Sequence, residues 1–171
     1  MPVETYAASE PRASPIAAIA TATMRCLIVA RSERQRRFLM RSASEAGWEV
    51  VSCRSAEEAV RQSRLRRAAF ALIDVAEAGP PVEGRIDGVD RDAIGALIRA
   101  LHGDRVLVAV CVADGDSEGE LWARCLGVWA CLPGVVEGCD LPSICRDAKA
   151  AVRKVARVDA GRLASETAAS W

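Results

Sequence analysis

The hydrophobic and polar positions of this chain follow a regular alternation from Met24 onward. Short, continuous apolar runs are typical of strands that are buried on both faces, and they predict strands over residues 25–30, 48–53, 69–75, 105–113 and 128–133. Between these runs, apolar residues recur every three or four positions, as they do on one face of a helix. This spacing predicts helices over residues 32–47, 55–67, 91–103, 116–127 and 139–156.

Two of the predicted helices also carry a signal for where they begin. Ser32 followed by Gln35, and Ser55 followed by Glu58, have the spacing of capping boxes. Apolar strands that alternate with amphipathic helices predict a parallel sheet with helices on both faces. Because crossovers between parallel strands are right-handed, the expected fold is α/β, a three-layer αβα sandwich of the flavodoxin-like (βα)5 type with a five-stranded parallel sheet.

The same pattern divides the chain into one domain and two ends. We expect a flexible N-terminal leader over residues 1–23, a domain over residues 24–157 and a C-terminal tail over residues 158–171. Residues 76–90 are rich in glycine, proline and acids, and they predict a long loop that is either functional or mobile. No apolar run reaches the roughly eighteen residues that a transmembrane helix needs, so no contact with a membrane is expected.

Charge narrows the classes of partner. The formal net charge is zero, so the chain as a whole is not expected to attract nucleic acid. Ten arginines between Arg31 and Arg67 predict solvated helix faces or, alternatively, a docking surface for an acidic protein. No aromatic residues interleave with these arginines, so they do not indicate nucleic-acid recognition.

Cysteines and acids narrow the classes of site. The chain has seven cysteines and one histidine but no Cys-x-x-Cys pair, so a zinc site is not predicted. The acids within residues 87–92 and 114–116 lack the ligand spacing of a calcium loop and are interpreted as turns and helix caps. We therefore expect no metal and no cofactor. The cysteines that lie in apolar runs predict buried thiols in a reducing, cytoplasmic compartment: Cys26, Cys53, Cys111 and Cys131.

Asp74 is the residue that this pattern does not explain, because it ends the apolar run "FALID" of residues 70–74. Ligands of open parallel sheets bind outside the carboxyl ends of the strands, and the third predicted strand ends at Asp74. The carboxylate is therefore either a reactive group or a structural remnant of one. No glycine-rich phosphate loop, paired catalytic carboxylate or Ser-His-Asp set accompanies it, so the sequence does not predict an enzyme.

Three segments in order carry a resemblance to a known family. They are "LIDVAEAG" (72–79), "VAVCVADGD" (108–116) and "GVWACLPG" (127–134). On these segments, and over residues 24–157, the chain resembles the receiver domain of bacterial two-component response regulators. The resemblance implies that Asp74 is the equivalent of the phospho-accepting aspartate of the phosphorelay.

The rest of the phosphorylation pocket departs from the family's pattern. The resemblance places the family's pair of acidic residues, which hold magnesium, at Ala30 and Arg31. It places the phosphate-binding threonine or serine at Val112, the lysine at Gly134 and the proline that follows the lysine at Val135. The chain is thus interpreted as a degenerate receiver, or pseudo-receiver.

These substitutions change what the pocket can do. Magnesium prefers carboxylate oxygens, and one carboxylate beside a guanidinium is a poor site for it. Arg31 is expected to pair with Asp74 and to occupy the place of the ion. The expected function is that of a stand-alone, non-enzymatic signalling module that acts through protein–protein contacts. The alternatives are a response regulator that phosphorylates Asp74 in an altered pocket, and a small-molecule sensor whose pocket is lined by Ala30 and Val112.

The resemblance also implies where a partner would bind. In receivers, the fourth helix, fifth strand and fifth helix form the face for a protein partner or for a homodimer. Here that face corresponds to residues 116–127, 128–133 and 139–156. Trp122, Trp129 and Val135 are candidate interface residues, and the alternative is that both tryptophans belong to the core.

Overall fold

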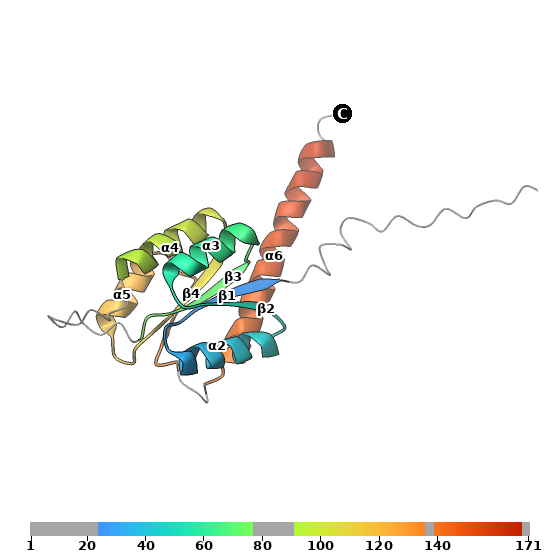
Figure 1. Cartoon of the computed structure of the whole chain (residues 1–171). Helices are drawn as coiled ribbons and strands as arrows, with labels where there is room; N and C mark the ends of the chain where they lie inside the picture. The colour runs from blue at the N-terminus through green and yellow to red at the C-terminus, as the bar shows by residue number, and fades with distance from the viewer. Residues whose placement is uncertain (1–23, 77–90, 136–138, 169–171) are drawn as a thin grey trace, which may run out of the picture.

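The protein is a three-layer sandwich in which helices cover both faces of one central sheet (Figure 1). The structure, a computed structural model, describes residues 24–76, 91–135 and 139–168, with side chains in the last helix as far as Val158. The predicted leader over residues 1–23 and nearly all of the predicted loop over residues 76–90 lie outside the described residues. The expected fold is confirmed.

The elements follow the predicted alternation, with ends that differ from the prediction by a few residues except at the end of the last helix. The strands are β1 (Arg25–Val29), β2 (Glu49–Cys53), β3 (Phe70–Asp74), β4 (Leu107–Val112) and β5 (Ala130–Pro133). The helices are α2 (Glu33–Glu45), α3 (Ala56–Leu65), α4 (Arg91–Gly103), α5 (Ser117–Cys125) and α6 (Leu141–Ala168).

All strands run parallel, in the order β2-β1-β3-β4-β5. The register pairs Val29 of β1 with Ile73 of β3, and Asp74 of β3 with Cys111 of β4. The carboxyl ends of β1, β3, β4 and β5 therefore meet along one end of the sheet, which we call the carboxyl edge. In sheets of this kind the carboxyl edge is where ligands and reactive groups are placed.

Alternation along the strands produces two separate hydrophobic clusters. One lies under α3, α4 and α5 and includes Ile73 and Val112, and the other lies under α2 and α6 and includes Phe70 and Leu72. Figure 1 shows α3, α4 and α5 on one side of the sheet and α2 on the other. Because successive side chains of a strand point to opposite faces, the register fixes which layer each site residue can reach.

The helix starts confirm the predicted N-caps and correct the capping boxes. The hydroxyl oxygens of Ser32 and Ser55 accept hydrogen bonds from the backbone N–H groups of Gln35 and Glu58. The Glu58 carboxylate accepts from the N–H of Arg54, one residue before the N-cap, and the Gln35 side-chain amide donates to the carbonyl oxygen of Val135, 3.0 Å away. Gln35 thus connects the start of α2 to the segment after β5.

The last helix is longer than the sequence pattern predicted. Instead of ending near residue 156 before a tail, α6 continues to Ala168, and Figure 1 shows it projecting beyond the sheet. Residues 157–168 have no continuous apolar stripe, but seven of these twelve residues are alanine, arginine, leucine or glutamate, which favour helix without one. Within the described ranges, no helix combines the length and the apolar character that a bilayer crossing requires.

Candidate functional site

The carboxyl edge brings Asp74 and Ala30 together. They are the next residues after the paired Val29 and Ile73, so they end neighbouring strands. Asp74 is 6% exposed and Ala30 is 1% exposed. Asp74 lies at the carboxyl end of β3, the end at which it was predicted to lie, whereas its role in a site stays a prediction.

Asp74 is held by the backbone that follows it. The N–H of Ala76 donates to Oδ1 of Asp74 at 3.1 Å, and the N–H of Val75 donates to the carbonyl oxygen of Cys111 at 2.9 Å. Burial, together with the negative charge of Asp74, raises the pKa of the Cys111 thiol well above its ordinary value. Cys111 is therefore a neutral neighbour of Asp74 and not a thiolate nucleophile.

Arg36 is the residue of this site that the sequence reasoning missed. Its side chain is buried, and its guanidinium donates to the carbonyl oxygens of Ala30 at 3.0 Å and of Arg31 at 3.3 Å. It also pairs with the Glu33 carboxylate. Arg36 thus fixes the backbone of the β1–α2 connection, where the family carries its acidic pair.

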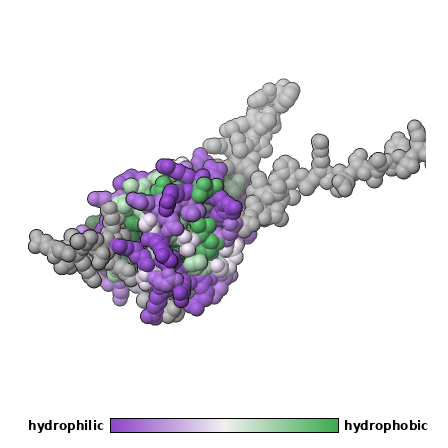
Figure 2. Space-filling view, in the orientation of Figure 1, coloured by the Kyte–Doolittle hydropathy of each residue, from purple (hydrophilic) through white to green (hydrophobic). Residues whose placement is uncertain are grey.

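Arg31 itself is exposed, in contrast to Asp74. The ion pair expected between them stays a prediction. Among the ten arginines from Arg31 to Arg67, nine are exposed and only Arg36 is buried. Exposure of the nine fits a solvated face and a docking surface alike, so both interpretations stay predictions. Figure 2 shows hydrophilic residues covering much of the surface on one side of the molecule.

The resemblance places the remaining pocket positions at Val112 and Gly134. Val112 is fully buried in the cluster under α3, α4 and α5, whereas Ala30 belongs to the cluster on the other side of the sheet. The sheet separates these two side chains, so they do not form the shared apolar pocket that the small-molecule alternative needs.

Gly134 adopts a backbone conformation that favours glycine. Its φ is +61°, and its N–H donates to the carbonyl oxygen of Val112 at 3.0 Å. A Cβ atom at this position would lie 3.2 Å from the Cβ atom of Asp114. The position where the family carries its lysine is therefore shaped for a residue without a side chain.

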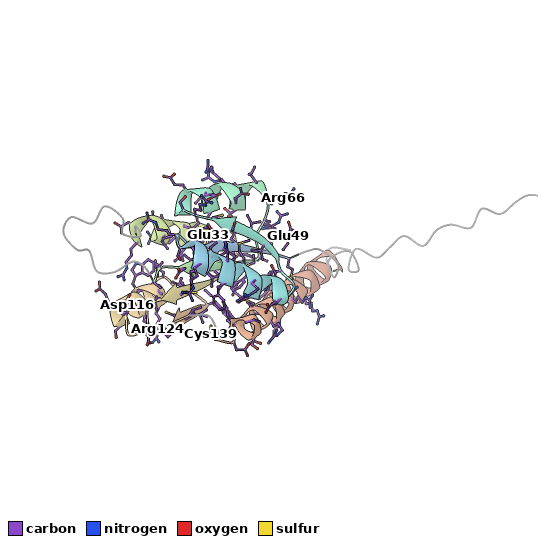
Figure 3. The ribbon with its side chains drawn as sticks, turned by 60° about the horizontal axis from the view of Figure 1, so that its bottom comes forward. Glu33, Glu49, Arg66, Asp116, Arg124 and Cys139 are labelled. Carbon is purple, nitrogen blue, oxygen red and sulfur yellow. The ribbon has the colours of Figure 1, made fainter. Side chains whose placement is uncertain are left out.

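A second polar group lies at the starts of α4 and α5. Asp116 caps α5 by accepting from the N–H of Gly119 at 2.8 Å, which confirms its predicted role. Its other carboxylate oxygen lies 3.1 Å from the guanidinium of Arg91, which in turn lies 5.9 Å from the ring centre of Trp122. Figure 3 shows Asp116 at the start of α5 and Arg124 further along that helix. The ion pair links the two helices beside the carboxyl edge.

The thiols follow the buried interpretation with one exception. Cys26, Cys53 and Cys111 are buried, whereas Cys131 is only partly buried. Burial raises the pKa of Cys53 to about 11 and that of Cys145 to about 12, so both stay protonated at neutral pH. Within the described residues, no group of three or more histidine, cysteine or acidic side chains could hold a metal ion.

The candidate interface residues have intermediate environments. Trp122 packs partly against the cluster under α3, α4 and α5, and Val135 packs partly against the cluster under α2 and α6. Trp129 is 40% exposed, and its ring meets that of Phe70 edge-on at 6.2 Å. Trp129 is thus anchored in the core on one side and open to solvent on the other.

Comparison of this architecture with solved structures decides the fold family. The chain is similar to a CheY-like response regulator receiver domain protein from Methanospirillum hungatei JF-1, with a TM-score of 0.58 and 14% identity over 78% of this chain and 96% of that chain. This chain has the receiver fold. Its predicted resemblance to receiver domains is confirmed at the level of structure.

Two further solved structures share this architecture but have different descriptions. NtrX from Brucella abortus matches with a TM-score of 0.63 and 17% identity, over 82% of this chain but only 30% of NtrX. A protein described as adenylate cyclase from Rhodopirellula baltica matches with a TM-score of 0.57 and 18% identity, over 84% of this chain and 98% of that chain. No family model matches the sequence, and no curated protein matches it. Likeness at these identities carries the fold and not the activity.

Proposed function

We propose that this receiver-fold domain acts as a non-enzymatic signalling module that binds a protein partner through the face formed by α5, β5 and α6. The observation that carries the proposal is the distribution of exposed apolar side chains. Five large hydrophobic residues are exposed among the described residues, and Leu65 on α3 is the only one away from this face. The other four are on α5, on α6 or directly before β5: Leu121, Trp129, Val155 and Val158.

Exposed apolar groups of this kind favour a partner surface. A large, partly exposed tryptophan that is anchored in the core is typical of an interface anchor, because it buries much area at little cost in conformational entropy. The partner is proposed to be a signalling protein or a second copy of this chain, in a reducing compartment where the free thiols persist.

The pocket around Asp74 supports a role that does not depend on phosphorylation. A transferring phosphoryl group needs its developing charge compensated, which magnesium and lysine do in the family's pocket. Here a buried alanine, a buried valine and a glycine stand at three of the positions concerned. The fourth of these positions is Arg31, which does carry a positive charge but is exposed to solvent.

The part of the proposal that concerns the pocket around Asp74 predicts the outcome of a phosphodonor experiment. Incubation of the purified chain with acetyl phosphate and Mg²⁺ is expected to add no phosphoryl mass, as read by intact-mass spectrometry, because the positions that hold magnesium and the lysine in the family's pocket are occupied here by Ala30, Arg31 and Gly134. Asp74→Asn is the matched control. An added mass of one phosphoryl group that is absent in Asp74→Asn would contradict the proposal and favour a phosphorylated response regulator instead.

The part of the proposal that concerns the face formed by α5, β5 and α6 predicts where a protein partner can be crosslinked. A photo-crosslinking amino acid at Leu121, which is 64% exposed, is expected to give a discrete protein adduct in the source cells. The same amino acid at Leu65, which is 74% exposed on α3, provides the matched control and is expected to give none. Adducts of equal yield at the two positions, or none at either, would count against the proposed face.

A further inference from the structure

An apolar groove opens at the end of the sheet opposite to the carboxyl edge. It has a volume of about 730 Å³ and lies between the middle of α6 and the amino ends of β3, β4 and β5. Its floor includes Ala69, Leu107 and Trp129, and Val152 and Val155 of α6 form one wall. The charged residues around it, among them Arg67, Asp104 and Arg105, are exposed.

The groove presents more apolar surface than its surroundings require. Trp129 is 40% exposed and Val155 is 58% exposed, and Val158, one turn further along α6, is 65% exposed. Covering these aromatic and aliphatic side chains with another apolar segment is favourable, because it removes their apolar surface from water. An occupant with aliphatic side chains fits this lining.

The chain itself enters the domain beside this groove. The carbonyl oxygen of Arg25 accepts from the N–H of Ala69 at 2.9 Å, and the carbonyl oxygen of Ala69 accepts from the N–H of Leu107 at 3.1 Å. Arg25 is thus hydrogen-bonded directly to a residue of the groove floor. Met24 packs against the cluster under α2 and α6, which also contacts Ala69 and Leu107. The residues before Met24 therefore join the domain next to the groove.

The sequence before Met24 contains one aliphatic segment of suitable size. Residues 14–20 read Ser-Pro-Ile-Ala-Ala-Ile-Ala, and Ile16 and Ile19 are the only large aliphatic residues between Tyr6 and Met24. Ala20 is four residues from Met24, a separation that spans up to about 14 Å when extended. The opposite end of the chain is directed elsewhere, since α6 runs outward past the sheet (Figure 1).

We propose that residues 15–20 of the same chain occupy this groove, with Ile16 and Ile19 as the side chains that cover Trp129 and Val155. A tethered segment is present at an effective concentration on the order of millimolar, so a small apolar contact suffices. A second copy would instead need an interface of roughly 1,000 Å² or more. This inference does not rest on the proposed function, because it concerns only contacts within one chain.

The test uses the full chain labelled with 5-fluorotryptophan and observed by fluorine NMR. The chain has four tryptophans, and Trp129→Phe assigns the resonance of Trp129. Broadening by a soluble nitroxide reports how exposed each ring is. The segment variant is Ile16→Asp with Ile19→Asp, and the matched control is Val3→Asp with Tyr6→Asp, which places the same charges earlier in the leader. Val155→Asp alters the groove wall from the other side.

The expected result is that nitroxide broadening of Trp129 increases at least twofold in the segment variant and in Val155→Asp, and stays unchanged in the control. The resonance of Trp48, which is buried and donates to the carbonyl oxygen of Cys145, reports in each variant that the domain is folded. Equal broadening of Trp129 in the wild type and the segment variant would overturn the proposal. Protection of Trp129 that grows between 20 and 400 µM protein would overturn it in favour of a second copy, with both concentrations chosen on the order of typical interface affinities.

Discussion

Replacing Phe70 by alanine is expected to lower the free energy of unfolding by about 3–5 kcal/mol, the largest effect of a single substitution that we predict. Phe70 is fully buried at the start of β3. Its ring lies 5.3 Å from that of Trp48 and 6.2 Å from that of Trp129. Truncation removes the burial of the ring and both aromatic contacts, and it leaves a cavity between β3 and α6 that rigid strands cannot close.

Urea unfolding followed by circular dichroism measures this effect. Domains of this size are typically stable by about 5–15 kcal/mol, so the variant is expected to be folded only marginally. Leu65→Ala is the control, because Leu65 is 74% exposed and its truncation is expected to change stability by less than about 0.5 kcal/mol. A loss below about 1.5 kcal/mol for Phe70→Ala would mean that the two tryptophans do not pack on a shared ring.

Arg36→Ala is expected to lower the free energy of unfolding by about 2–4 kcal/mol. The substitution leaves the carbonyl oxygens of Ala30 and Arg31 without the charged donor that they share, and it removes the buried aliphatic stem. Hydrogen bonds from a charged donor are worth about 1.5–3 kcal/mol, more than those between neutral groups. The β1–α2 connection at the carboxyl edge is expected to lose its fixed backbone.

The neighbouring arginine provides the control for this prediction. Arg37 pairs with the same carboxylate, Glu33, but its side chain is 77% exposed. Arg37→Ala is therefore expected to cost at most about 1 kcal/mol. Hydrogen exchange of the amides of residues 30–32 separates the two roles, since it should rise in Arg36→Ala and not in Arg37→Ala. Equal losses in the two variants would show that Arg36 acts only through Glu33.

Much of the fold could be predicted from the sequence because burial imposes a period on it. The apolar run of residues 69–75 became β3, and the stripe of residues 91–103 became α4 with the same bounds. The end of α6 could not be predicted in this way, since residues 157–168 form helix through propensity and not through an apolar stripe. Periodicity detects elements that pack against the core and misses those that project from it.

The candidate site was less predictable, because its contacts join residues far apart in the chain. The position of Asp74 followed from strand order, but the bond from Gln35 to the carbonyl oxygen of Val135 joins segments that no local pattern relates. Arg36 did leave a signal. It precedes Leu39 and Ala43 by three and seven positions, which places it on the buried stripe of α2. A charged residue on an apolar stripe is expected to have a specific buried partner.

Gly134 makes a lysine difficult to introduce at the position where the resemblance places the family's lysine. Lysine at this position would have to adopt a φ of +61°, at a cost of roughly 1–2 kcal/mol, and its Cβ would press on Asp114. Reinstating the family's lysine thus requires a new path for the backbone after β5 as well as a new side chain. Since Val135 in that same segment is bonded to Gln35, such a path would also disturb the start of α2. The glycine at this position is therefore built into the course of the main chain, and a variant designed to carry the lysine would have to rebuild the connection after β5 first.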